Sequence, residues 1–469
     1  MIPQPRRRII VALILLALGI AAVRDFSRLG TALPWRTMDE FADFYCAGWA
    51  LDRGASPYTY EPLRTCEHRF NTGPGFRGSV FASNPAVAIP APLPPYDFPA
   101  FMALARASFA AARIVDAIAI VSAVALCAIA LAQLGVPLAL AAAALTLGAG
   151  YVELNAGQIV PFALLALILC GLALARGRDW LAGLLAAVTA IEPSIGIPVI
   201  TATLLFVPRA RWAVVITAAL LAVAAIALVG TGGIVEYVAR VLPAQAGSEV
   251  RFPFQYSLSF ALAFFGVPPA AATDAGAFSF IALFALGLWL AARAPRAFRS
   301  RSLLVFLPAL CAATAGTYVH QEELCFALPA ALILASRSQG TPRVVAGAAV
   351  CALSIPWIFV WGMKQLFLAS IFVSAVILER LRVDFRMAVI VLGALALTIY
   401  CFELHPPHLM TPEFANHMYA ANDLVQREWR DYAAQRSTHD ALWFAIKIPT
   451  WAAQLALLAI AAGRIRNET

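Results

Sequence analysis

The sequence predicts an all-α, polytopic integral membrane protein, and three observations lead to this fold class. Hydrophobic residues make up 62% of the 469 residues and charged residues only 13%, whereas soluble domains carry close to a quarter charged residues. The mean hydropathy is +0.80. Apolar runs long enough to cross a hydrocarbon core of about 30 Å recur along the whole chain. We therefore expect a bundle of about 12–14 hydrophobic helices in one domain over residues 1–469.

The expected helices follow from these apolar runs in chain order. The first run follows Arg6–Arg8 and is similar to a signal peptide, but many spans come after it, so we expect an uncleaved first span. The short runs 180–191 and 194–207 are expected to form a broken or partial span. The expected helices are 9–24, 109–132, 136–152, 158–175, 180–191, 194–207, 212–230, 276–293, 302–316, 323–336, 343–361, 365–379, 387–402 and 441–461.

The positive charges predict the orientation of the chain in a cell inner or plasma membrane. The net charge is +8, but the arginines gather in short loops, so the basic balance indicates topology and no nucleic-acid partner. If these loops are cytoplasmic, the positive-inside rule is satisfied and both termini are cytoplasmic. The loops carry Arg6–Arg8, Arg176/Arg178, Arg209/Arg211, Arg293/Arg296/Arg299/Arg301, Arg337/Arg343, Arg380/Arg382/Arg386 and Arg464/Arg466.

The opposite, extracytoplasmic face receives the long loops and most of the acidic residues. Two apolar stretches in these loops, 83–98 and 257–265, are expected to be re-entrant or interfacial, because irregular backbone at membrane depth needs a covered cavity. In the last loop, 414–432 is expected to form an amphipathic lid helix, and the prolines of the HPPH segment argue against a metal pair. The expected outer segments are 25–108, 231–275, 403–440, 153–158, 192–194 and 318–323.

The first outer loop carries a carboxylate cluster and two cysteines. Asp39, Glu40 and Asp43 are expected to lie on a short polar helix, and an ionised residue at a lipid boundary must be solvated, paired or used. Cys46 and Cys66 are expected to form a disulfide if this face is oxidising; the alternative is two separately packed thiols.

Over roughly residues 40–335, an ordered set of motifs resembles glycosyltransferase family 87, whose members have the GT-C fold and include polyprenyl-phosphate-mannose-dependent mannosyltransferases and arabinofuranosyltransferases. One departure is Glu192-Pro193, where related sequences commonly carry Lys-Pro. The motifs are Asp43-Phe-Tyr-Cys-Ala-Gly with Gly54-Ala-Ser-Pro57-Tyr58, Asn84-Pro85, Asn155-Ala-Gly157-Gln158, Arg178-Asp-Trp180-Leu-Ala-Gly183, Glu192-Pro193 and Tyr318-Val-His320-Gln-Glu322-Glu323-Leu324.

The resemblance implies a GT-C-type hexosyl- or pentosyltransferase. Such an enzyme moves mannose or a pentose from a polyprenyl-phosphate donor to a glycolipid or glycan acceptor. The resemblance also implies that the reaction takes place among membrane lipids on the extracytoplasmic face. The phosphate is already a good leaving group, so the chemistry needs one general base for the acceptor hydroxyl, and direct displacement inverts the anomeric centre. Asp43 is the predicted base, while Asp39 and Glu40 are expected to be helix-entry residues.

The remaining polar residues of this face are predicted to bind substrate, and no cofactor or metal is expected. Glu322 and Glu323 suit the acceptor hydroxyl, or anchor the chain at the interface. His320 suits the phosphate or the sugar, and is otherwise a packed polar residue. The neutral donors Asn155 and Gln158 suit sugar hydroxyls, with helix termination as the alternative, and the outer-face cations Lys364, Arg251 and Arg69 are available for the phosphate.

Two other functions stay open at this point. A transporter or lipid-linked sugar flippase places ionisable residues near the membrane midplane in repeated halves, whereas the polar residues here gather at one face. An O-antigen ligase or polymerase also uses a lipid-linked donor and differs mainly in donor size. No nucleotide-sugar fingerprint or Gly-rich phosphate loop follows a plausible strand, so a nucleotide-dependent enzyme is not expected.

Overall fold

The computed structural model describes residues 4–38, 40–70, 88, 90–314, 316–360, 363–405 and 440–468. Within these ranges the protein is all-α: there is no strand, and the one isolated β-bridge joins Gln255 to His320. The predicted fold class is therefore confirmed. The lid predicted over 414–432, Asp39 and the Asn84-Pro85 motif lie outside the described residues.

Each of the fourteen predicted spans coincides with helical structure, although several are divided. The second half of the 136–152 span is a π-helical turn, Thr146–Tyr151, and a 3-10 turn, Glu322–Ala327, precedes the helix predicted from residue 323. The helices are α1 (Gln4–Phe26), α2 (Pro34–Thr37), α3 (Phe41–Asp52), α4 (Tyr60–Phe70), α6 (Phe98–Ala105), α7 (Phe109–Gln133), α8 (Leu138–Leu145), α9 (Val152–Ala156), α10 (Val160–Ala175), α11 (Asp179–Val188), α12 (Pro193–Phe206), α13 (Arg211–Glu236), α14 (Leu242–Ser248), α15 (Leu258–Phe264), α16 (Pro269–Ala297), α17 (Leu303–Ala312), α18 (Leu328–Arg337), α19 (Gly340–Ser354), α20 (Trp357–Val360), α21 (Lys364–Arg380), α22 (Phe385–Leu404), α24 (Ala441–Ala445) and α25 (Ile448–Glu468).

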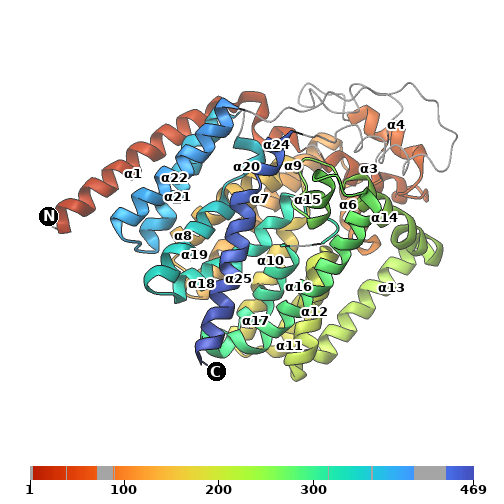
Figure 1. Ribbon diagram of the computed structural model, residues 1–469. Helices are drawn as coiled ribbons and strands as arrows, with labels where there is room; N and C mark the ends of the chain where they lie inside the picture. The colour runs from red at the N-terminus through yellow and green to blue at the C-terminus, as the bar shows by residue number, and fades with distance from the viewer. Residues whose placement is uncertain are drawn as a thin grey trace.

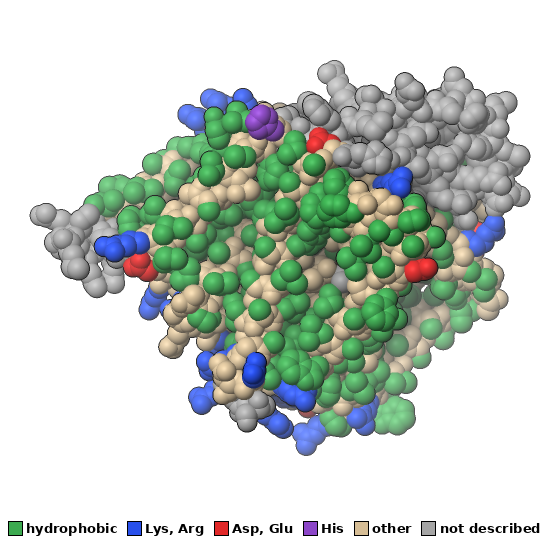
Figure 2. Space-filling view, in the orientation of Figure 1, with side chains coloured by type: hydrophobic (Ala, Val, Ile, Leu, Met, Phe, Trp, Pro, Cys, Tyr) green, Lys and Arg blue, Asp and Glu red, His purple; other side chains and the backbone are tan. Residues whose placement is uncertain are grey.

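The helices differ in how much of their surface they bury. All ten residues of α17 are buried, and α10 and α18 are buried almost throughout. By contrast, α1 and α13 expose large apolar side chains such as Val23 (72%) and Leu220 (64%). In Figure 1 these two helices flank the bundle on opposite sides, and Figure 2 shows hydrophobic side chains over much of the visible surface. Such an apolar exterior suits a lipid environment.

Seven helical stretches within the described residues are long and apolar enough to cross a membrane by length and composition. Four shorter apolar helices accompany them, at Val160–Ala175, Asp179–Ile191, Pro193–Phe206 and Leu303–Ala312. The 257–265 stretch, expected to be re-entrant or interfacial, contains only the seven-residue helix α15, which is too short to span a bilayer. The seven stretches are Ile9–Asp52, Phe109–Gln133, Leu138–Ala156, Pro208–Gly247, Pro269–Ala297, Phe385–Leu404 and Ala441–Asn467.

The first outer loop folds onto the bundle through α3. This helix is not the polar element that the carboxylates suggested: nine of its twelve residues are buried, Asp43 among them, and it packs against α6. Close approach depends on Gly48, because a Cβ there would lie 2.4 Å from the Phe101 carbonyl carbon. A helix with this much buried surface holds its side chains in fixed positions, as a functional site requires.

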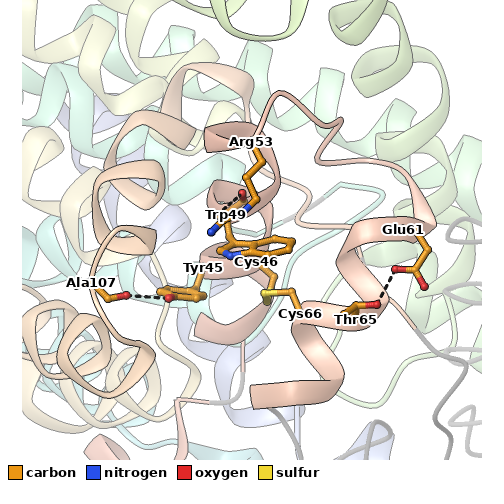
Figure 3. The surroundings of a disulfide bond; sticks show 8 residues. All are labelled: Tyr45, Cys46, Trp49, Arg53, Glu61, Thr65, Cys66 and Ala107. Carbon is orange, nitrogen blue, oxygen red and sulfur yellow. Dashed lines mark hydrogen bonds between the residues drawn. A yellow bond between two sulfur atoms is a disulfide. The ribbon is translucent and has the colours of Figure 1, made fainter.

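A disulfide ties α3 to α4. The sulfur atoms of Cys46 and Cys66 are 2.08 Å apart, so the predicted disulfide is present and the alternative of two separately packed thiols is wrong. Figure 3 shows the bond beside Tyr45, whose hydroxyl donates to the Ala107 carbonyl oxygen at 2.9 Å. The bond and this contact fix α3 on both sides, three residues or fewer from Asp43.

The charged residues separate toward two ends of the bundle. The helix α10 begins just after Gln158 and ends before Arg176, so about 24 Å of helix separates the two residues. Likewise, α18 follows the Glu322–Ala327 turn and ends at Arg337. Figure 2 shows Lys and Arg side chains gathered at the lower end, where Figure 1 places α11, α17 and the C-terminus. We call these two ends the carboxylate end and the arginine end.

Candidate functional site

Glu40 connects the first loop to the 153–158 junction. It occupies the N-cap position of α3 but makes no capping hydrogen bond with its side chain. Its carboxylate instead accepts a hydrogen bond from the Gln158 side-chain amide, and its backbone N–H donates to the Ala156 carbonyl oxygen at 2.8 Å. The interpretation of Glu40 as only a helix-entry residue therefore leaves out its contact with Gln158.

The late polar motif centres on His320, whose two ring nitrogens both face polar side chains. Nε2 contacts the carboxylate of Glu249, while Nδ1 lies 3.2 Å from the Tyr318 hydroxyl and 3.6 Å from Glu322 Oε2. The backbone N–H of His320 donates to the Glu323 carboxylate. His320 is 9% exposed and Glu249 6%. An imidazole this enclosed, with three carboxylates around it, is the positive counterpart of a buried acidic cluster.

The segment before α15 holds Glu249 against this motif. Gln255 bridges the two segments, since its Nε2 donates to Glu249 Oε2 at 3.2 Å and its Oε1 accepts from the Val319 N–H at 3.0 Å. The Tyr256 N–H donates to the Val319 carbonyl oxygen at 2.6 Å, which leaves the pair aligned as a short antiparallel bridge. These bonds set the distance between Glu249 and His320.

The last apolar stretch, Ala441–Asn467, braces the same segment. The Lys447 ammonium donates to the Pro253 carbonyl oxygen at 2.6 Å and the Trp443 carbonyl oxygen at 2.8 Å. It also lies 4.2 Å from the centre of the Phe260 ring. The Trp451 indole donates to the Tyr256 carbonyl oxygen at 2.9 Å. The last span thereby positions the loop that holds His320.

Electrostatic interactions join the first loop to this late motif. Glu40 interacts with Glu322, His320, Asp43 and Glu249, so the carboxylates of the first loop and those of the 318–323 motif belong to one cluster. The predicted site residues Asp43, Gln158, His320, Glu322 and Glu323 are therefore brought to the same end of the bundle.

Two further carboxylates extend the cluster. Glu153 is fully buried, neither of its carboxylate oxygens has a hydrogen-bond partner within the described residues, and it interacts with Glu322, Glu323, Glu40 and Glu192. Glu192 accepts a hydrogen bond from the Ser194 hydroxyl at 3.0 Å. Burial raises the pKa of Glu192, while the Ser194 hydrogen bonds and the charge of His320 act in the opposite direction.

His320 keeps its proton because of these neighbours. Burial alone disfavours the imidazolium and lowers its pKa, but Glu249, Glu322 and Glu323 outweigh burial and raise the pKa of His320 to about 10. At neutral pH the imidazole is therefore a cation. It supplies positive charge at the point where the carboxylates meet, and that charge is suited to a developing anion.

Three further predicted binding residues differ in how they relate to the cluster. The Asn155 side-chain oxygen accepts from the Thr37 hydroxyl at 2.8 Å, so this oxygen serves packing of α2 on α9. Lys364 is exposed at the first residue of α21, and within the described residues no hydrogen bond or ion pair joins it to the carboxylates. Arg251 lies two residues after Glu249, and its buried Nε has no hydrogen-bond partner within the described residues.

Glu249, Glu153 and Glu192 are the site members that the sequence interpretation did not select. Glu153 and Glu192 stood at polar junctions between spans, and a buried acid between two apolar helices is itself a signal. The sequence around Glu249 gave a weaker signal, because its outer loop is apolar, no motif includes it, and Arg251 lies two residues later. The described residues hold no group of three or more His, Cys, Asp or Glu side chains arranged to bind a metal ion.

The arrangement can perform one kind of chemistry with its own residues. Buried carboxylates can accept a proton from a hydroxyl group, and the neighbouring imidazolium can offset negative charge that develops on a leaving group. No buried Ser, Thr or Cys nucleophile touches His320 within the described residues. The site therefore suits base-assisted transfer to a hydroxyl.

Comparison with models of protein families gives a match. The model of glycosyltransferase family 87 matches residues 93–319, a range that contains Asn155, Gln158 and Arg251. The match ends one residue before His320 and does not include Asp43. Neither the curated proteins nor the solved structures gave a match. The resemblance that the motifs indicated is thus confirmed for the central part of the chain.

Proposed function

We propose that this chain, which belongs to glycosyltransferase family 87, transfers mannose or a pentose from a polyprenyl-phosphate donor to a glycolipid or glycan acceptor. Family membership and the apolar helices make the chain a membrane glycosyltransferase. The donor, the acceptor, the reaction face and the residue roles are the proposal. The observation that carries it is the meeting of the first-loop carboxylates with the His320 motif in one buried cluster.

Asp43 acts as the general base in this proposal. It takes the proton of the acceptor hydroxyl while the hydroxyl oxygen forms a bond to the anomeric carbon. The bond between that carbon and the phosphate oxygen breaks, and polyprenyl phosphate leaves with the electron pair. The displacement inverts the anomeric centre. The burial of Asp43 on a helix fixed by the Cys46–Cys66 disulfide supports this role, because a base must be held at hydrogen-bond distance from the proton that it takes.

The phosphate is proposed to meet Arg251 rather than to bind His320 directly. Both ring nitrogens of His320 already face protein partners, whereas the Nε of Arg251 is buried without a partner within the described residues. A guanidinium suits phosphate because it offers planar paired donors. This also addresses the Glu192-Pro193 departure, since a cation from another segment replaces the lysine of related sequences. Glu322 and Glu323 are proposed to bind the acceptor hydroxyls.

The extracytoplasmic face is supported by two independent features. A disulfide forms in an oxidising compartment and is rare in a reducing cytosol, and Cys46–Cys66 lies at the carboxylate end. Arginine-rich loops are retained on the cytoplasmic side, and they lie at the other end. A donor anchored by a polyprenyl tail would present its phosphate at the outer headgroup level, where the carboxylate end lies in this orientation.

Proteoliposomes containing the full chain test the proposal. Polyprenyl-phosphate-mannose and a polyprenyl-phosphate pentose are supplied with acceptor glycolipid, and transfer is measured for wild type, Asp43→Asn and the matched control Asp52→Asn. Asp52 lies on the same helix and pairs with Arg106 at 2.9 Å, away from the cluster. We expect Asp43→Asn to lower the rate by about 10²- to 10⁴-fold and Asp52→Asn to leave it near wild type.

Three results would contradict the proposal. Undiminished transfer by a folded Asp43→Asn protein would remove Asp43 as the base. Absence of transfer from every lipid-linked donor, together with movement of donor across the vesicle membrane, would favour the transporter or flippase. Transfer only from a large lipid-linked glycan would favour the O-antigen ligase or polymerase.

A further inference from the structure

We propose that a cavity at the arginine end binds the phosphodiester headgroup of an anionic phospholipid. The cavity has a volume of about 480 Å³. Four arginines line it, Arg176, Arg299, Arg301 and Arg337, and no carboxylate does. This site lies at the opposite end of the bundle from the carboxylate cluster and does not depend on the function proposed for that cluster.

The cavity opens where several helices end together. Its lining comes from the C-terminal ends of α7, α10, α16 and α18 and from the turn that joins α16 to α17. Two of these helices, α7 and α16, are among the stretches long and apolar enough to cross a membrane. The ends of spanning helices lie at the level of the lipid headgroups, so the cavity meets the membrane at the depth of the phosphates.

Two of the four arginine side chains have no partner within the described residues. Arg176 donates to the Gln133 side-chain oxygen at 2.6 Å, and Arg301 pairs with Asp179 at 2.9 Å. For the Arg299 and Arg337 side chains, by contrast, the described part of the chain provides neither a hydrogen bond nor an ion pair. The cavity thus holds an excess of positive charge with unused N–H donors. Paired guanidinium donors match the oxygens of a phosphate.

The simpler explanation is that these arginines complement helix dipoles or only fix topology. Cationic side chains near helix ends often donate to the last carbonyl groups, yet the side-chain bonds of Arg176 and Arg301 go to an amide and a carboxylate. Moreover, Arg299 has φ +51°, a left-handed conformation that favours glycine. An arginine kept at a position that suits glycine indicates a use for its side chain.

The lining also favours a lipid over free phosphate. Apolar side chains, Leu134, Leu172 and Pro295, complete the wall beside the arginines. On the outer surface of α7, Ile129 and Leu126 are about half exposed and run toward the cavity end of the helix. A phospholipid can place its phosphate among the guanidinium groups and its glycerol and acyl chains along these apolar surfaces. Basic pockets between spanning helices are suited to such headgroups.

Binding of stated lipids to the purified full chain tests the site. Native mass spectrometry and a thermal-unfolding titration are run with phosphatidylglycerol, phosphatidylcholine and inorganic phosphate. The variant Arg299→Gln/Arg337→Gln is compared with Arg209→Gln/Arg386→Gln, which removes two exposed arginines outside this cavity and so makes the same change in net charge. We expect phosphatidylglycerol to bind wild type and the control equally, and to bind the cavity variant about thirty-fold more weakly.

Three outcomes would overturn the proposal. Equal loss in both double variants would mean that only general surface charge attracts the lipid. Equal binding of phosphatidylcholine would mean that the headgroup charge is not recognised, and equal stabilisation by inorganic phosphate would mean that the ligand is not a lipid. If the double variant does not fold, Arg299→Gly replaces it, because glycine adopts the left-handed conformation freely; unchanged phosphatidylglycerol binding by this variant would also count against the site.

Discussion

The two ends of the helix bundle hold charge under opposite conditions. At the carboxylate end, Glu153 is fully buried and Glu249 is 6% exposed. At the arginine end, the Arg301 side chain is 46% exposed and its partner Asp179 15%. Exposed charges are solvated and cost little, so their placement can serve topology or lipid contact. Buried charges must be compensated within the protein, and a cluster of them that is retained in a membrane protein indicates function.

The difference has a direct consequence for single substitutions. At the carboxylate end one imidazolium faces several acids, so the loss of one group affects all of them. At the arginine end the charges are exposed or form local pairs such as Arg301–Asp179, so the loss of one group is local. Changes at the carboxylate end should therefore have larger effects than changes at the arginine end.

The largest effect is expected for His320→Gln. This change removes the cation that Glu40, Glu322 and Glu323 share, and breaking a buried charge pair costs about 3–5 kcal/mol. We expect a matching loss in the free energy of unfolding and a loss of sugar transfer, measured by thermal unfolding and the proteoliposome assay. The control is His405→Gln, since His405 is exposed at the end of α22. Equal stability of both variants would contradict the role of His320 as the shared cation.

Much of this fold follows from the sequence, because hydropathy determines which segments enter a bilayer. The fourteen predicted spans are helical for that reason. The Asp43 and His320 segments were also recognised separately, from motifs. Their meeting could not be predicted, because it depends on how α3 packs against α6 and how the 318–323 turn packs against residue 249. Glu249 could not be predicted, because only its contact with His320 shows that it belongs to the site. The contact of Asn155 with Thr37 could not be predicted either, because it depends on the packing of α2 on α9.

An intermediate effect is expected in the pH dependence of stability. The folded-state pKa of His320 is about 10 and its ordinary value 6.5. A raised pKa stabilises the fold fully below the unfolded value, and the stabilisation is lost as pH rises toward the folded value. We therefore expect wild type to lose stability progressively between about pH 6.5 and pH 10.

The variant Glu249→Gln makes this pH dependence specific to His320. It removes the strongest interaction that raises the pKa of His320. Burial, which lowers this pKa, is then less opposed, and the pKa falls. A charge-assisted hydrogen bond contributes about 1.5–3 kcal/mol, so the total stability loss should be smaller and should be complete about 1–2 pH units lower than in wild type. Unfolding midpoints measured across this pH range check the shift. If Glu249→Gln and wild type lose stability over the same pH interval, another group is responsible.

The smallest effect on stability is expected at the arginine end, for Asp179→Asn. The pair with Arg301 is partly exposed, so its loss should cost at most about 1 kcal/mol and less at high salt. The same change should strengthen phosphatidylglycerol binding about five-fold, because it frees Arg301 to face the cavity. Thermal unfolding and lipid titration of one protein sample measure both quantities. Weaker lipid binding would show that Asp179 positions Arg301 for the headgroup, and a stability loss as large as that of His320→Gln would remove the contrast between the two ends.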